Sequence, residues 1–208
     1  MSRISQPAAH FTPALFKFMR ELAANNDRDW FNANKDRYLK DLRDPALQFV
    51  VDFGARLVKI SPHFLADPRP NGGALFRIYR DIRFSKDNRP YKTNCAMQFR
   101  HEAGQDAHAP GLYLHLEPGN CVAAAGLWRP PTPQCRTIRD AIAADPGAWH
   151  EAVGGLDRFG EQLKRVPAGY GSTHPAADEL RWKDFGVYRS LTQQDVLAAD
   201  AHERIGAV

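Results

Sequence analysis

Six basic residues recur at every third position within one short stretch of the chain. Only Asp81 and Asp87 oppose them there, so the stretch carries six positive and two negative charges, a net +4. The whole chain has the same net charge of +4, which means that all other residues together sum to zero. A local excess of positive charge attracts anions to one place, whereas a diffuse excess mainly affects solubility. The basic residues are Arg77, Arg80, Arg83, Lys86, Arg89 and Lys92.

Strand periodicity decides which of these side chains can act together. Apolar residues alternate with polar ones over residues 76–84 and again over residues 91–100, and alternate residues of a strand point to opposite faces. Two guanidinium groups on either side of a phenol form a suitable clamp for phosphate or carboxylate. The candidate ligand-binding residues on the outward face are Arg77, Tyr79, Arg83, Lys92 and Asn94.

Two residues are assigned structural roles. Alternation sends Arg80 to the apolar face, where a guanidinium without a partner is costly, so we expect a carboxylate beside it. Trp30 lies in a polar and aromatic cluster at residues 25–31, where an aspartate can cap a helix while Trp30 docks in the core. The alternative is that Arg28 and the asparagine amides of this cluster line the same pocket as the basic strands.

Acid–base chemistry has three candidate residues. His115 and Glu117 share one face of a third predicted strand, and Asp81 lies on the outward face of the first. In an enzyme, Asp81 or Glu117 would act as the base and His115 as the acid, while arginines hold the charge of the ligand. The sequence contains no HExxH, GxSxG, Walker or GxGxxG motif, so neither a metal nor a cofactor is expected.

The hydrophobic periods divide the chain into three blocks. Helices are predicted at residues 13–25, 27–42 and 45–60, followed by strands at 76–84, 91–100, 112–117 and 121–128, and then by helices at 133–144, 146–153, 156–163 and 191–205. This order predicts an α+β fold with N-terminal helices, a central antiparallel β-meander with one face on the core, and C-terminal helices. We expect a single domain over residues 1–208, in which residues 1–10 are disordered.

The composition indicates a soluble protein of the cytoplasm. Of the 208 residues, 43% are hydrophobic and 25% are charged, which is typical of a globular domain. No window approaches the roughly 18 to 20 apolar residues of a membrane span, and the N-terminus lacks the apolar region of a secretory signal. The three cysteines lack CxxC spacing, which favours free thiols in a reducing compartment.

Several of these stretches resemble one protein family. They are FKFMRELAANNDRDWF at residues 16–31, KDRY at 35–38 and RIYRDIRFSKDNRPYKT at 77–93, with weaker matches in GLYLH at 111–115 and GLW at 126–128. On these residues the chain resembles DUF2461, a family of conserved domains of unknown function found in bacteria and fungi. The resemblance implies a common fold and the location of the site. It implies no substrate, cofactor, catalytic residue or reaction.

Three functions are compatible with these observations. The first is the binding of a phosphorylated or other anionic ligand on the basic β-sheet face. The second is a hydrolase-like enzyme that acts on such a ligand, and the third is a structural or interaction protein with an acidic partner. The net charge of +4 is modest and no RRM, KH or helix-turn-helix signature is present, so we expect a small anionic ligand rather than nucleic acid, and no membrane partner.

Overall fold

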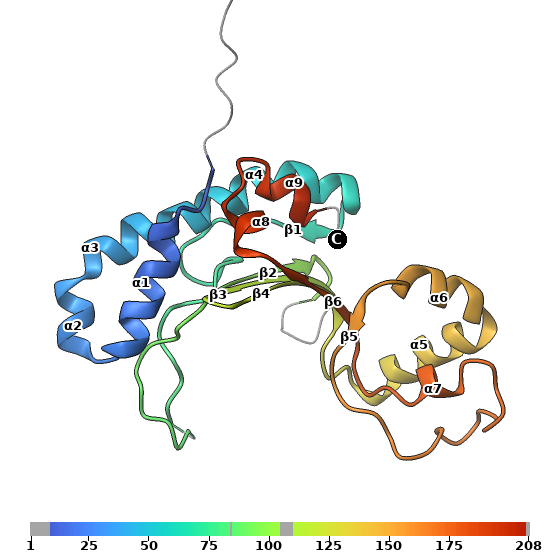
Figure 1. Cartoon of the computed structure of the whole chain (residues 1–208). Helices are drawn as coiled ribbons and strands as arrows, with labels where there is room; N and C mark the ends of the chain where they lie inside the picture. The colour runs from blue at the N-terminus through green and yellow to red at the C-terminus, as the bar shows by residue number, and fades with distance from the viewer. Residues whose placement is uncertain (1–8, 84, 105–109, 207–208) are drawn as a thin grey trace, which may run out of the picture. The chain divides into compact units, whose positions relative to one another are not determined.

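The computed structural model of the chain describes residues 9–83, 85–104 and 110–206 (Figure 1). Phe84, His108 and the first eight residues of the predicted disordered N-terminus therefore lie outside the described residues. The helices and strands are α1 Pro13–Ala24, α2 Arg28–Ala33, α3 Lys35–Tyr38, the π-helical η1 Leu39–Arg43, α4 Asp44–Ile60, β1 Phe64–Leu65, β2 Cys95–His101, β3 Gly111–Glu117, β4 Asn120–Leu127, α5 Thr132–Ala144, α6 Pro146–Val153, β5 Asp157–Arg158, α7 Ala177–Leu180, β6 Phe185–Leu191, α8 Gln193–Leu197 and α9 Ala201–Ile205.

Helices at both ends of the chain and an antiparallel sheet between them confirm the α+β prediction. The hydrogen-bonded order of the six strands is β1-β2-β3-β4-β6-β5. The chain divides into two compact units, of which the first comprises Met1–Phe99, Tyr113–Ala123 and Ser190–Val208 and the second Arg100–Leu112 and Ala124–Arg189. The single domain expected from the sequence stays a prediction.

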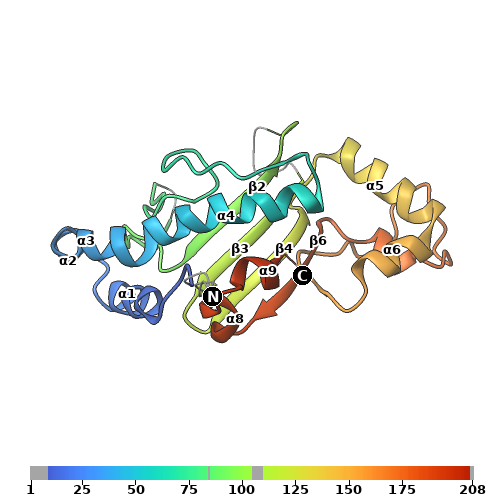
Figure 2. The ribbon, with the colours of Figure 1, turned by 90° about the horizontal axis from the view of Figure 1, so that it is seen from above.

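The core of the first unit forms between the helices and one face of the sheet. Leu15, Phe18 and Leu22 recur at helical spacing along α1 and are buried, because residues three and four apart share one face of a helix. Phe53 of α4 packs on Phe99 of β2 with ring centroids 4.8 Å apart. Figure 2 shows α4 lying across β2 and β3.

Strand β3 divides its side chains between the two faces of the sheet. Leu114 and Leu116 are buried in the core. Because side chains alternate along a strand, Tyr113, His115 and Glu117 lie on the opposite face, and these three residues are half-buried. The predicted meander therefore has one face on the core, as the sequence indicated.

The predicted helix break at Asp44 and Pro45 is wrong. Asp44 has helical backbone angles, with φ −69° and ψ −42°, and its N–H group donates to the carbonyl of Leu39, five residues earlier. Pro45 has no N–H group to donate, and the π-helical turn before it lets the proline enter the helix without a break. The predicted helix at 27–42 is instead divided at Asn34, which separates α2 from α3.

The second unit has a core of its own, and one predicted helix in it is wrong. Its buried residues are Cys135, Ile142, Ala176, Leu180 and Phe185. Residues 156–163 do not form a helix, because the short strand β5 pairs antiparallel with β6 and Gly160 adopts φ +101°. A Cβ atom at Gly160 would lie 2.3 Å from the buried carboxylate of Asp184, so this turn requires glycine.

The last predicted helix, residues 191–205, is also only partly right. Its first residue ends strand β6, and the rest forms the two short helices α8 and α9. A capping box between Thr192 and Asp195 starts α8, and extended backbone at Ala198 ends it. A membrane-crossing helix would have to be longer and more apolar than any helix found among the described residues.

Candidate functional site

The basic stretch pairs with the segment that leads into β2, but it is not a continuous strand. Two isolated antiparallel bridges, Leu75 with Met97 and Tyr79 with Tyr91, join the two segments. The predicted strand at 76–84 is therefore only partly right. Of the residues predicted to face the core, Phe76 is half-buried and the others, Ile78, Tyr91, Cys95, Met97 and Phe99, are buried. Ile82, which the pattern placed on the apolar face, is 37% exposed.

A bulge interrupts residues 91–97, between these two bridges. Leu75 and Tyr79 are four residues apart, whereas their partners Met97 and Tyr91 are six apart. The surplus residues disrupt the ladder and turn consecutive side chains toward the same face. Strict alternation would have placed Thr93 on the core face with Tyr91.

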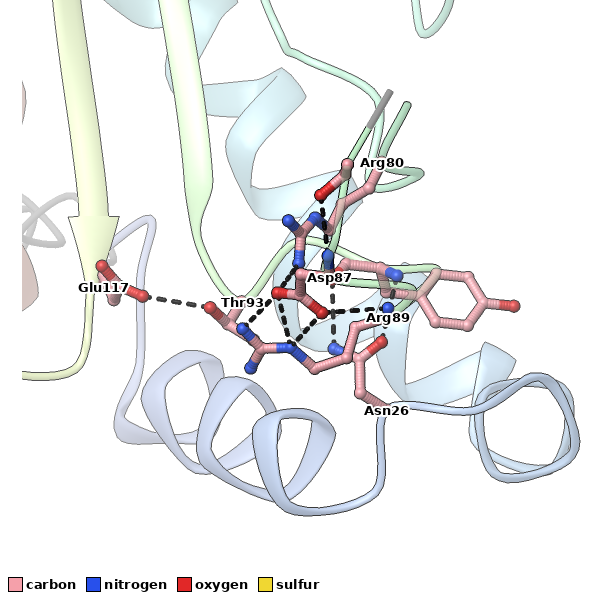
Figure 3. Close-up of polar contacts among 8 residues, drawn as sticks. Asn26, Arg80, Asp87, Arg89, Thr93 and Glu117 are labelled. Carbon is pink, nitrogen blue, oxygen red and sulfur yellow. Dashed lines mark hydrogen bonds and ion pairs between the residues drawn. The ribbon is translucent and has the colours of Figure 1, made fainter. Parts of the chain in front are cut away.

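The bulge is anchored from the helical side by a single asparagine. The side-chain amide of Asn26 donates to the carbonyl oxygen of Tyr91 at 3.0 Å, and its side-chain oxygen accepts from the Tyr91 N–H group at 3.0 Å (Figure 3). The two bonds satisfy both backbone groups of Tyr91, as a neighbouring strand would do. The Tyr91 ring also stacks on Phe31, with centroids 4.1 Å apart.

Carboxylates in the basic stretch neutralise several of its arginines. Asp81 accepts from the backbone N–H and the guanidinium of Arg83. Asp87 does the same for Arg89. These hydrogen bonds lower the pKa of Asp81 to about 2 and that of Asp87 well below its usual range.

Arg80 has the carboxylate partner that its position demands. Its guanidinium donates to Asp87 at 2.5 Å, so this carboxylate bridges Arg80 and Arg89 (Figure 3). The Arg80 side chain is 26% exposed and therefore half-buried rather than buried. The ion pair agrees with the sequence argument, whereas full burial does not.

Two cations of the stretch are in a different situation. Within the part of the chain that the structure describes, neither Arg77 nor Lys92 forms an ion pair. The Lys92 ammonium is half-buried and lies over the Phe76 ring, 5.2 Å from its centroid. Burial, and then repulsion from Arg77, lower the pKa of Lys92. Arg77 contributes only the smallest part of the lowered Asp81 pKa.

The side chains that follow Lys92 join a hydrogen-bonded cluster with β3. Asn94 Nδ2 lies 2.9 Å from His115 Nδ1, and the Thr93 hydroxyl donates to Glu117 Oε1 at 3.0 Å. His115 Nε2 lies 3.2 Å from Glu117 Oε2, and the Tyr113 hydroxyl lies 3.1 Å from His115 Nδ1. We call Thr93, Asn94, Tyr113, His115 and Glu117 the polar cluster.

Aromatic contacts link the polar cluster to the unpaired lysine. The Tyr113 ring meets the Phe76 ring edge-on, with centroids 6.2 Å apart, and Lys92 covers the same Phe76 ring. Burial, followed by the nearby Cys95 thiol and Glu117 carboxylate, raises the pKa of Tyr113. Tyr113 therefore remains a neutral phenol.

The structure brings only some of the sequence-predicted site residues together. Asn94, His115 and Glu117 are joined by hydrogen bonds, and Lys92 is linked to them through Phe76. Tyr79 instead packs toward Tyr91 and Phe31, and Arg83 and Asp81 pair with each other. Sequence reasoning did not assign a site role to Thr93 or Phe76. Thr93 could not be found, because the bulge that redirects it has no local signal.

The cluster at residues 25–31 is mainly a helix junction. Asp27 caps α2 by accepting from the Trp30 N–H group at 2.8 Å, and Asn25 donates to the carbonyl of Glu21. Trp30 packs on Phe18, with ring centroids 5.8 Å apart. The alternative assignment was partly useful, since Asn26 does reach the basic segment, but it binds backbone there.

In the described ranges, no group of three or more histidine, cysteine or acidic side chains is arranged to hold a metal ion. Burial raises the pKa of Cys95 to about 12, which makes this thiol inert. Two cavities, of about 560 and 530 Å³, lie elsewhere and contain none of the predicted site residues.

Comparison with known proteins agrees with the resemblance noted in the sequence. Residues 14–208 match the family model of DUF2461, described as a conserved hypothetical protein. No curated protein and no solved structure matches the chain. The match covers essentially the whole chain, including the basic stretch, the polar cluster and both compact units.

Proposed function

Since this chain belongs to the DUF2461 family, whose description names no activity, we propose from its geometry that the basic face binds a small oxyanion. Phosphate, or the phosphoryl group of a small ligand, would lie between Arg77 and Lys92. The arginine fork offers two parallel donors and the ammonium offers a point charge, and both are common phosphate ligands.

The single observation that carries this proposal is the state of Lys92. A half-buried ammonium with a neighbouring guanidinium and no ion pair among the described residues is an unfavourable arrangement on its own. An oxyanion bound between the two cations offsets both the desolvation and the repulsion. A solvated surface lysine would show neither feature.

The proposed site uses fewer cations than the site expected from the sequence, which included Arg83. Arg83 and Arg89 are engaged by Asp81 and Asp87, so they add little net charge to the face. Arg77 and Lys92 together suit one phosphate group, whereas nucleic acid binding depends on many phosphate contacts. This favours a small anion over an oligonucleotide.

Thermal melting of the whole chain in phosphate, at constant ionic strength, tests the proposal. A phosphate concentration 100 times Kd should raise the melting temperature by about 5 to 10 °C, because the anion binds the folded state only. Arg77→Gln and Lys92→Met should each remove most of this rise. Arg83→Gln is the matched control, because Arg83 lies in the same stretch but is already paired, and it should keep the rise.

Two outcomes would reject the oxyanion site. One is a wild-type protein whose melting temperature does not respond to phosphate or sulfate. The other is an equal loss in Arg83→Gln and Arg77→Gln, which would indicate diffuse electrostatics. In either case the interaction with an acidic protein partner becomes the better hypothesis.

The polar cluster favours a second candidate, a hydrolase-like enzyme that acts on the bound anion. Glu117 orients His115, as a carboxylate orients a catalytic histidine in many enzymes, and the substrate would have to replace Asn94 and Tyr113 at the other ring nitrogen. Asp81 is a poor base, because Arg83 holds its pKa at about 2. Hydrolysis of simple phosphate esters that is lost in His115→Gln, with phosphate binding retained, would support the enzyme. Absence of hydrolysis by the wild-type protein would leave the binding function.

A further inference from the structure

The polar cluster beside the two cations restricts what else the ligand can carry. We infer that the ligand is a hydroxylated phosphate ester, such as a polyol or sugar phosphate, whose phosphoryl group lies on Arg77 and Lys92 and whose hydroxyl group donates to the polar cluster. This inference rests on the proposed oxyanion site. The donors and acceptors that the cluster has left over, once its internal hydrogen bonds are made, support it.

The protonation of His115 follows from its neighbours. Asn94 offers its amide nitrogen to His115 Nδ1 at 2.9 Å, and an amide nitrogen can only donate. His115 Nδ1 is therefore the unprotonated, accepting nitrogen. The proton of the neutral ring is on Nε2, which donates to Glu117 Oε2 at 3.2 Å. Both ring nitrogens are thus engaged inside the cluster.

Both hydroxyl groups of the cluster donate their hydrogen to another member of the cluster. Tyr113, whose hydroxyl lies 3.1 Å from the unprotonated Nδ1, can interact with it only by donating its O–H and shares the single lone pair of this nitrogen with the Asn94 amide. The Tyr113 oxygen is then left to accept. The Thr93 hydroxyl donates to Glu117 Oε1 at 3.0 Å. Glu117 thus receives two hydrogen bonds, and a carboxylate has about four lone-pair sites.

The cluster consequently offers acceptors to a ligand, from Tyr113 and Glu117, next to two cations that offer donors. Glu117 is one-third exposed, so a ligand can reach it. Its negative charge repels a phosphoryl group, which must remain on the side of Arg77 and Lys92. A hydroxyl group, by contrast, can donate to Tyr113 or Glu117.

Phe76 determines how the two halves of the site are connected. The Lys92 ammonium lies 5.2 Å from the centroid of the Phe76 ring, and the Tyr113 ring centroid lies 6.2 Å from the same centroid. The carbon skeleton of a short polyol phosphate can lie against this ring while its two ends reach the cations and the acceptors. An inorganic phosphate ion would contact only the cations Arg77 and Lys92 and not the acceptors of the polar cluster.

Isothermal titration of the folded chain with a pair of matched esters tests this inference. Glycerol 3-phosphate and n-propyl phosphate carry the same charged group on a three-carbon chain, and only the first has hydroxyl groups. One additional neutral hydrogen bond should make glycerol 3-phosphate bind about three- to tenfold tighter. Tyr113→Phe should reduce this preference while leaving the Kd of n-propyl phosphate within about twofold.

Two further variants make the result interpretable. Tyr170→Phe removes a hydroxyl group in the second unit, where it bonds to Asp140, and should keep the full preference. Glu117→Gln should reduce the preference in the same way as Tyr113→Phe, which keeps the test open if Tyr113→Phe does not fold. Equal affinity for both esters, or a preference that survives in both cluster variants, overturns the inference and leaves the oxyanion site intact. Failure of both esters to bind the wild type rejects the proposed function itself.

Discussion

Two pairs of basic residues in the same stretch differ in whether a carboxylate neutralises them. Arg83 and Arg89 are exposed and each is held by an aspartate two residues earlier in the chain. Arg77 and Lys92 have no ion pair in the described part of the chain, and Lys92 is half-buried against an aromatic ring. Regular spacing of charges therefore does not indicate which of them are available to a ligand.

The difference has a local cause that can be read from sequence. Outside the helices, each of the three Asp-X-Arg segments forms the same contact, in which the aspartate accepts from both the backbone N–H and the guanidinium of the arginine. They are Asp67 with Arg69, Asp81 with Arg83, and Asp87 with Arg89. Leu75 and Pro90 stand two residues before Arg77 and Lys92. Without an aspartate at that position, these two cations stay available.

Among the basic residues of the stretch, replacement of Arg80 is expected to change the free energy of unfolding most. Arg80→Leu leaves Asp87 with one partner and should lower the free energy of unfolding by about 1 to 2 kcal/mol. This is less than the 3 to 5 kcal/mol of a fully buried pair, because the Arg80 side chain is 26% exposed and water screens the pair. Urea denaturation of Arg80→Leu and of the exposed control Arg83→Leu measures the difference. A control change as large as that of Arg80→Leu would contradict it.

A smaller effect of opposite sign is expected for Lys92. Burial and Arg77 lower its pKa in the folded state, so the unfolded state holds this proton more tightly and the ammonium destabilises the fold at neutral pH. Lys92→Met should therefore melt at the same or a slightly higher temperature than the wild type near pH 7. The advantage should shrink as the pH rises through the lowered folded-state pKa toward 10.5, where both states lose the proton.

Melting curves of the wild type, Lys92→Met and Lys86→Met between pH 7 and about 10 test this prediction. Lys86 is exposed and belongs to the same stretch, so its replacement controls for the loss of one positive charge. A clear loss of stability in Lys92→Met at pH 7 would mean that the lysine is structural. The oxyanion proposal would then lose its main support.

The smallest effect on stability is expected for the exposed ion pair between Asp81 and Arg83. Hydrogen bonds from Arg83 hold the pKa of Asp81 at about 2, so this carboxylate favours the folded state above its ordinary value of 3.8, and the contribution disappears as the pH falls through about 2. Both groups are exposed, so the change in stability should be hard to detect. Carboxyl NMR titration should show the pKa of Asp81 returning toward 3.8 in Arg83→Gln. An unchanged pKa would show that the pair does not persist in solution.

Prediction from the sequence succeeded where periodicity was strong and failed where turns competed with it. Helix α1, the strands β3 and β4 and the helix α6 were placed well, because their apolar residues recur at a single period. Residues 156–163 also have a helical pattern, but Gly160 takes φ +101° and β5 pairs with β6 instead. At Pro45 the proline signal was misleading, because a π-helical turn admits it.

The sequence by itself determined the α+β order, the location of the basic stretch and the carboxylates that pair with Arg83 and Arg89. These features depend on residues two to four positions apart, and such interactions form whenever the local backbone allows them. Only the tertiary structure decided the composition of the candidate site. The bulge before β2 turns Thr93 and Asn94 to partners on β3 that are 24 and 21 residues away, and Asn26 holds Tyr91 across 65 residues. Such contacts depend on strand register and on helix packing, which the whole core determines and no short stretch encodes.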